Sequence, residues 1–335
     1  MTDPSRRASG LRTWFSVNGR LEFVLTLASV TLLTGACVAL ILLPRNAGPL
    51  QLATDEAEVI GTTANLGDPR LTPVRQDLQP FGPILVRQVA AGGSSEALLV
   101  AHPSHRTDLD VLEQQLAPAI AAVSATWGTG WNRAPVIVVA GTPAEFTALT
   151  RAAGTTAEVA AVALTGSYVP GTEPTEQRIV FNPDARRRVG DEGLATLLRH
   201  ELTHVATRAA TGDGAPLWLT EGYAEYVAQR GQGSTFSQIA PTLTTRLRAG
   251  VLPTDLTADA DFTGTDAPYA YETAWSACAF LADRYGPDTL TTLYQRLATG
   301  PQDRAASDAA FAAVLGTTRA DLLDGWQAWL RGRAG

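Results

Sequence analysis

Apolar residues along the chain follow two different periods. Five short apolar runs, bounded by glycine, proline and polar residues, are typical of strands; they cover residues 83–89, 96–101, 135–140, 159–168 and 177–181. The first two flank the segment AGGSS and predict a hairpin. Residues 108–126 carry apolar side chains at helical spacing, and Pro118 is expected to kink or interrupt that helix. Thr142, with Glu145 three positions later, predicts the start of another helix.

From residue 191 to the C-terminus the pattern is helical. Gly286 and Gly300 predict the ends of two of these helices. The last helix has an apolar stripe formed by Leu322, Trp326, Trp329 and Leu330. Strands followed by helices are typical of an α+β fold. The sequence therefore predicts a small N-terminal mixed sheet and a C-terminal helical subdomain.

A run of 21 residues without a charge covers residues 23–43. At about 1.5 Å per residue this run can cross a hydrocarbon core roughly 30 Å thick. It exceeds the apolar region of a cleaved signal peptide, about 7–15 residues, and it continues beyond Cys37, which disfavours a lipoprotein signal. Four arginines precede the run and only Arg45 follows closely, so the positive-inside rule places the N-terminus in the cytoplasm.

These observations predict the domain organisation. We expect a cytoplasmic segment (1–22), a single-pass transmembrane helix (23–43), a linker (44–80) and a folded domain (81–335) on the outer side of the cell membrane. The membrane is thus an expected partner through one N-terminal helix.

Composition narrows the classes of function. The chain has 26 basic and 33 acidic residues, a formal net charge of −7 and no lysine. An acidic chain without basic runs argues against nucleic acid as a partner. Cys37 and Cys278 lie far apart in the sequence, the first in an apolar run, and predict no disulfide.

Residues 200–204 read His-Glu-Leu-Thr-His and carry the candidate chemistry. In a helix, His200 and His204 lie on one face, one turn apart, so both can bind the same metal ion. Glu201 lies about 100° around the helix, where it can take a proton from a metal-bound water. The other two histidines, His102 and His105, are expected in a solvated loop. A different face of the helix is apolar and predicts the side that packs on the core; it comprises Leu194, Leu198, Leu202 and Val205.

A catalytic zinc usually has three protein ligands and one open position. Residues 218–226, Trp-Leu-Thr-Glu-Gly-Tyr-Ala-Glu-Tyr, predict a second helix that carries Glu221, with sixteen residues between His204 and Glu221. That separation allows the first helix to end, the chain to turn and the second helix to lie alongside. Glu225, one turn after Glu221, could accept the second ring N–H of a ligating histidine. A solvated glutamate beside two partly buried histidines is the simpler alternative, and the second segment disfavours it.

These residues resemble the gluzincin metallopeptidases, and most closely the peptidase MA-like group, relatives of the thermolysin and aminopeptidase N families. The resemblance covers about residues 191–285. It implies a zincin-like fold with an active-site helix, and Zn²⁺ as the cofactor. It further implies that His200, His204 and Glu221 are the zinc ligands. Glu201 is then the general base, and Glu225 is the carboxylate that accepts a hydrogen bond from a ligating histidine. The implied reaction is hydrolysis of a peptide or protein substrate, with zinc-bound water as the nucleophile.

Residues 271–274, Tyr-Glu-Thr-Ala, are similar to the Tyr-Glu-Lys-Gly segment of aminopeptidase N-type enzymes. The resemblance implies that Tyr271 stabilises the oxyanion, with Tyr269 as the alternative. Two departures from the family pattern matter: the spacing to Glu221 is shorter, and the glycine-rich segment that holds a free amine is not recognisable. Aminopeptidase activity is therefore not implied.

Two other functions remain open at this point. The same scaffold could be a binding module without turnover, or a zinc hydrolase of a non-peptide amide or ester. Glu201 favours the enzyme, because a purely structural zinc site needs no base. An extended substrate is expected to add to an edge strand, formed by residues 159–168 or 177–181.

Overall fold

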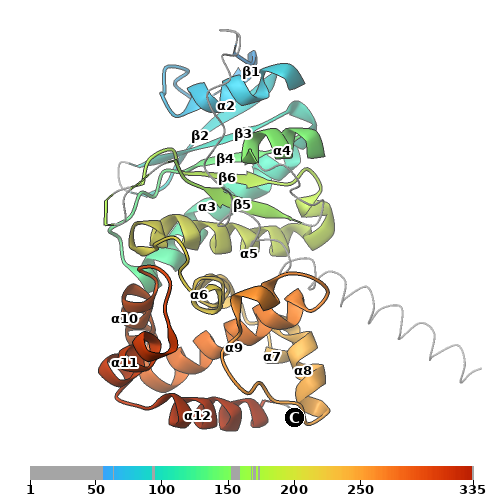
Figure 1. Cartoon of the computed structure of the whole chain (residues 1–335). Coiled ribbons are helices and arrows are strands. Elements are labelled where there is room, and N and C mark those ends of the chain that lie inside the picture. The colour runs from blue at the N-terminus through green and yellow to red at the C-terminus, as the bar shows by residue number, and fades with distance from the viewer. Residues whose placement is uncertain are drawn as a thin grey trace, which may run out of the picture.

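The computed structural model describes residues 56–333, apart from residues 63, 93–94, 152–158, 167, 169–170 and 173 (Figure 1). The expected cytoplasmic segment (1–22) and transmembrane helix (23–43) lie outside the described residues. Within the described part of the chain, no helix is both long enough and apolar enough to span a bilayer.

A mixed sheet of six strands forms the N-terminal part of the molecule (Figure 1). Its strands are β1 (Val59–Thr62), β2 (Ile84–Ala90), β3 (Glu96–Ala101), β4 (Val136–Val139), β5 (Ala161–Leu164) and β6 (Arg178–Phe181). Their order across the sheet is β1-β2-β3-β4-β6-β5. β2 and β3 pair antiparallel as the predicted hairpin, β3, β4 and β6 run parallel, and β5 is an antiparallel edge strand beside β6. The five predicted strands and the mixed sheet are confirmed.

Part of the predicted linker (44–80) folds onto the sheet. Residues Val59–Thr62 form β1, parallel to β2, and α2 (Leu71–Leu78) buries Leu71, Val74 and Leu78. The linker prediction is therefore wrong for these residues, and the folded domain starts before residue 81. A strand of four residues and a helix of eight are too short to produce a recognisable period.

Besides α2, three more helices belong to the part of the molecule that contains the sheet. They are α3 (Arg106–Trp127), α4 (Pro143–Thr150) and α5 (Ala185–Thr207). Figure 1 shows α4 in front of the sheet and α3 behind it. α3 continues through Pro118, so the expected interruption does not occur. Proline has no N–H for the carbonyl oxygen four residues earlier in the helix, but Pro118 is exposed, so that oxygen can bond to water instead. The cap of α4 is confirmed, because the Thr142 hydroxyl accepts a hydrogen bond of 3.2 Å from the Glu145 amide.

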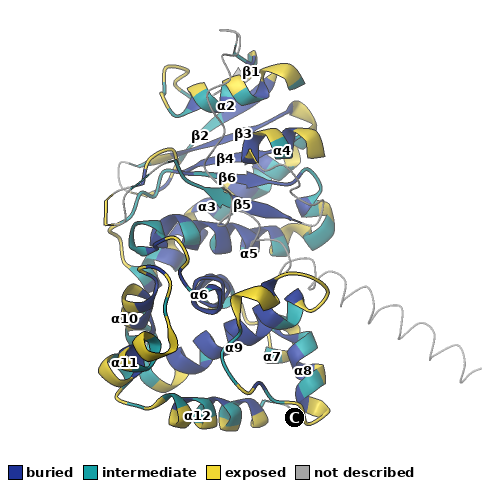
Figure 2. Cartoon of the chain, in the orientation of Figure 1, coloured by how far each residue is buried: buried dark blue, intermediate teal, exposed yellow. Residues whose placement is uncertain are grey.

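The C-terminal part of the described chain is helical, as predicted. Its helices are α6 (Leu217–Gln229), α7 (Phe236–Ile239), α8 (Pro241–Arg248), α9 (Ala267–Tyr285), α10 (Pro287–Leu297), α11 (Arg304–Leu315) and α12 (Arg319–Arg331). Figure 2 shows α6 at the centre, buried over most of its length between α5 and α9. The structure is an α+β fold in which α5 belongs to the sheet layer and α6 to the helical subdomain.

His102 is buried at the end of β3, which contradicts the expected solvated loop. Its Nε2 lies 3.0 Å from Glu145 Oε2 on α4, and its Nδ1 lies 2.8 Å from the Pro83 carbonyl oxygen. Both partners are acceptors, so both ring nitrogens are suited to donate and the ring is favoured as imidazolium. The hydrogen bond that His102 donates to Glu145 raises the pKa of His102 above its ordinary 6.5, against the opposing effect of burial.

This pair predicts a pH-dependent contribution to stability. Because the folded-state pKa of His102 is raised, the contribution is complete below about pH 6.5 and is lost as pH rises through the folded pKa. We expect His102→Gln to lower the free energy of unfolding by about 2 kcal/mol at acidic pH and by less at pH values above neutrality. Urea unfolding of both chains across this range measures the difference. A loss that grows with pH would contradict the charged pair.

Candidate metal centre

The helix that carries the histidines, α5, is interrupted at Gly190. Inside α5 this residue has φ of +72°, outside the helical region, and so divides the element into a first turn and a long second part. A left-handed φ of this kind favours glycine. The predicted apolar face is buried, and comprises Leu194, Leu198, Leu202 and Val205. With that face against the core, the opposite face is turned towards α6.

The three predicted ligands lie together between α5 and α6. His200 Nε2 and His204 Nε2 are 3.0 Å apart. Glu221 Oε2 lies 3.4 Å from His200 Nε2 and 3.6 Å from His204 Nε2. His200 and Glu221 are buried, and His204 is partly exposed. In the described residues this is the only group of three or more such side chains whose ligand atoms lie close enough for one metal ion.

The triangle of ligand atoms has the size that zinc requires. Bond lengths of about 2.0–2.1 Å in a tetrahedron separate neighbouring ligand atoms by about 3.3 Å. The observed edges of 3.0, 3.4 and 3.6 Å bracket that value. Both carboxylate oxygens of Glu221 are buried and have no hydrogen-bond partner in the described part of the chain. A buried carboxylate without donors is expensive unless a cation compensates it, so these residues fit a zinc ion.

Glu221 is ionised at neutral pH. Burial alone would raise its pKa, but the positive charge of His204 and the two imidazole rings, 3.4 and 3.6 Å away, together outweigh burial and lower the pKa to about 2. The site thus offers one carboxylate and two imidazoles, which is a donor set that zinc prefers.

Glu225 contacts the ring nitrogen of His200 that faces away from the other two ligand atoms. His200 Nδ1 lies 3.1 Å from Glu225 Oε2, so Nδ1 donates and Nε2 is left with its lone pair towards the other two ligand atoms. Gln229 Nε2 donates to Glu225 Oε1 over 2.8 Å. The sequence interpretation included Glu225 and missed Gln229, although its position one turn further along α6 was a usable signal.

We expect Glu225→Ala to weaken metal binding by about 10–100-fold, because His200 loses the acceptor that orients its ring. Competition with a chromogenic zinc chelator measures this affinity. Glu225→Gln keeps an acceptor oxygen and should lose less. Equal affinity in all three chains would show that the contact between His200 and Glu225 does not support the metal.

The other predicted site residues lie on α5 and α9. Glu201 directly follows His200 and is buried. α9 packs along α6, and Tyr271 on α9 is buried with its ring edge-to-face against Phe262, 5.0 Å between centroids. Tyr269 is partly exposed and lies under the guanidinium of Arg246, 3.8 Å from the ring centroid. The two tyrosines therefore have different surroundings, and only Tyr271 is in the core.

Glu272 is a buried acid that the sequence interpretation left without a role. Its Oε2 accepts a hydrogen bond of 2.6 Å from the Leu243 amide at the start of α8. Burial raises the pKa of Glu272 to about 7, and the negative charge of Glu225 contributes to the rise. A second carboxyl group therefore lies near the one that orients His200.

Comparison with known proteins agrees with this centre. Residues 190–332 match the family model of the Peptidase MA superfamily. This part of the chain is similar to that superfamily. The superfamily match and the His-His-Glu group together support a zinc metallopeptidase of the gluzincin type with Zn²⁺ as its cofactor. No curated protein matches the chain.

Several solved structures are similar to the chain at low identity. An M1 zinc metallopeptidase from Deinococcus radiodurans has 18% identity and a TM-score of 0.45, over 75% of this chain and 53% of that one. A two-domain M1 zinc metallopeptidase variant bound to L-arginine has 17% identity and a TM-score of 0.47, over 75% and 52%. A Deinococcus radiodurans variant bound to a Tyr-Ser-Ala substrate has 16% identity and a TM-score of 0.45, over 75% and 53%. The chain spans about half the length of these structures.

Proposed function

We propose that the chain is a zinc-dependent peptidase that hydrolyses peptide bonds. The observation that carries the proposal is the compact triangle formed by His200 Nε2, His204 Nε2 and Glu221 Oε2, with edges of 3.0–3.6 Å. Bound zinc would supply a Lewis acid that activates water near neutral pH and polarises a carbonyl group.

Each residue near the triangle has a proposed role. His200, His204 and Glu221 hold the zinc, and Glu225 keeps the His200 ring in the ligating orientation. Glu201 is the general base: its carboxylate accepts a proton from the attacking water and delivers it to the leaving amine. Tyr271 is proposed to donate a hydrogen bond to the oxyanion that forms on the substrate carbonyl.

The sheet edge suggests how a substrate lies. Of the two strands considered from sequence, β6 is enclosed between β4 and β5, whereas β5 is the last strand of the sheet and packs on α5. An extended peptide can therefore pair with β5 and lie along the helix that carries the histidines. The segment 177–181 cannot do this, because its two edges are already paired.

We also propose that residues 23–43 anchor the enzyme in the cell membrane, with the catalytic domain outside the cytoplasm. The support is the uncharged run and the arginines before it. Protease protection of the tagged full chain in sealed cells tests the orientation. A C-terminal tag that stays protected in intact cells would contradict it.

Metal analysis and peptide cleavage test the main proposal together. We expect one zinc per purified full chain, cleavage of members of a peptide library, loss of cleavage with a chelator, and recovery when zinc is returned. Glu221→Ala should lose both zinc and cleavage. Zinc bound without cleavage of any peptide would favour the binding module, and cleavage confined to esters or non-peptide amides would favour the third function.

A further inference from the structure

A cavity lies apart from the metal centre. It has a volume of about 650 Å³, and none of the three metal-binding residues lines it. Its walls come from the start of α2, the segment before β4, the end of α4, the end of β5 and the segment before β6. Cavities of about 300–1,000 Å³ are typical of small-molecule sites. Since Leu164, Thr165 and Gly166 line it, the cavity adjoins the end of the edge strand.

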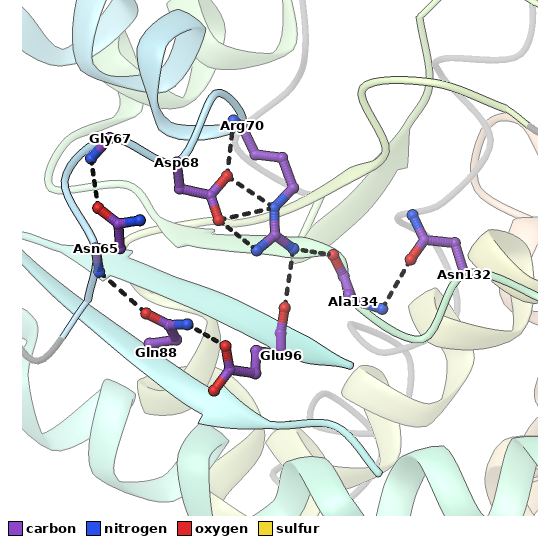
Figure 3. Close-up of polar contacts among 8 residues, drawn as sticks. All are labelled: Asn65, Gly67, Asp68, Arg70, Gln88, Glu96, Asn132 and Ala134. Carbon is purple, nitrogen blue, oxygen red and sulfur yellow. Dashed lines mark hydrogen bonds and ion pairs between the residues drawn. The ribbon is translucent and has the colours of Figure 1, made fainter. Parts of the chain in front are cut away.

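On one wall of this cavity two arginines are already paired with groups of the protein itself. Arg70 binds Asp68 through Nε and Nη2, at 3.0 and 2.6 Å, and donates from Nη1 to the carbonyl oxygens of Glu96 and Ala134 (Figure 3). Arg178 is paired in the same way, with Asp77 at 3.0 Å and with the Leu149 carbonyl oxygen at 2.5 Å. These two arginines support the cavity and have few donors left for a ligand.

Two opposite charges on the cavity wall are unpaired within the described residues. Arg151 and Glu176 are both exposed, and neither side chain has a hydrogen-bond or ion-pair partner in that part of the chain. Both are close enough to Arg178 to influence its pKa, which Arg151 lowers and Glu176 raises. One cation and one anion thus lie at the same cavity, and neither is paired with another described residue.

The same two residues also have an unusual backbone conformation, with a positive φ angle. Arg151 and Glu176 both have φ of +53°, and in the described part of the chain no other residue except glycine has a positive φ. Arg151 ends α4 in this left-handed conformation, where glycine is the ordinary choice. Strained backbone of this kind gathers at ligand sites. Two charged residues at two such positions on one cavity are a second observation in favour of a ligand.

We propose that this cavity binds a small zwitterion, a free amino acid or a short peptide, whose carboxylate pairs with Arg151 and whose ammonium group pairs with Glu176. The apolar side chains of Val74, Val136 and Leu164 line the same cavity and contact the apolar part of the ligand. The site is separate from the metal centre, and its occupancy does not depend on catalysis.

Binding of a dipeptide tests the proposal. The full chain carrying Glu201→Gln is titrated with Leu-Leu by calorimetry in the presence of a chelator, so that neither turnover nor the metal takes part. We expect saturable one-to-one binding. Leu-Leu-amide, which lacks the carboxylate, and N-acetyl-Leu-Leu, which lacks the ammonium group, should each bind at least tenfold more weakly. Free leucine and Leu-Leu-Leu then show which length of zwitterion binds most tightly.

Glycine variants test which charged residue pairs with which end of the ligand. Glycine adopts a positive φ without strain, so Arg151→Gly and Glu176→Gly should melt at the same or a higher temperature than the parent chain. In Arg151→Gly, Leu-Leu and Leu-Leu-amide should bind equally; in Glu176→Gly, Leu-Leu and N-acetyl-Leu-Leu should bind equally. Arg187→Gln and Glu192→Gln, at exposed positions on α5, are matched controls and should bind as the parent does.

Three results would overturn the proposal. They are no binding of any of the zwitterions to the parent chain, equal binding of the blocked and unblocked peptides, and unchanged discrimination in the two glycine variants. All are independent of peptidase activity, so failure of this site and failure of the proposed function can be distinguished.

Discussion

Replacement of Glu201 by glutamine should reduce kcat by a factor of about 10²–10⁴, the usual contribution of a general base. Glutamine has nearly the same shape but cannot accept the proton that the carboxylate takes. Glu201 does not belong to the group that converges on the metal position, so the zinc content should stay at one per chain. Steady-state cleavage of a peptide found in the library screen, with zinc measured on the same preparation, checks both expectations.

The matched control for this change is Glu192→Gln, an exposed glutamate on the same helix, which should retain full activity and zinc. The combination of lost turnover and retained metal is the decisive result. A Glu201→Gln chain that keeps most of its turnover would remove the general-base assignment. A chain that loses zinc would mean that Glu201 holds the metal centre together and has no separate role in proton transfer.

The proximity of two of the proposed metal ligands was predictable because their arrangement is local. His200 and His204 lie one turn apart on a helix whose apolar residues fix the orientation of the opposite face. Glu221 could be proposed because the second helical segment follows after a short loop. Its contact with both histidines, at 3.4 and 3.6 Å, depends on how α5 and α6 cross, and residue spacing alone does not determine that crossing.

Features that depend on distant parts of the chain could not be predicted in the same way. β6 lies between β4 and β5, so the strand that comes later in sequence is inside and the earlier one is the edge. The contact between His102 and Glu145 spans 43 residues and leaves no pattern in the sequence. Glu272 was hidden for the same reason, since its partner, the Leu243 amide, comes from another helix. Periodicity reports which face of an element is buried, and it does not report which element covers that face.

The crossing of α6 and α9 depends on Gly222, which directly follows the proposed ligand Glu221. A Cβ atom at Gly222 would lie 2.4 Å from the Ala274 carbonyl oxygen and 3.0 Å from Cys278 Sγ. The closer contact is with backbone, so rotation of a side chain cannot relieve it and the two helices must separate. Overpacking of this kind costs about 1–3 kcal/mol, and occasionally more, whereas alanine gains only about 1 kcal/mol over glycine through helix propensity.

We therefore expect Gly222→Ala to lower the free energy of unfolding by about 2 kcal/mol, and to weaken zinc binding as well, because Glu221 and Glu225 flank the displaced residue on α6. Urea unfolding and chelator competition measure the two effects. Gly325→Ala on α12 is the matched control: its Cβ would meet only the Phe280 ring, at 3.3 Å, so the change should be neutral or stabilising. Adding Cys278→Ala to Gly222→Ala should not restore stability, since the clash with the Ala274 carbonyl oxygen remains. Recovery in that double variant would place the tight contact at the thiol and not between the two backbones.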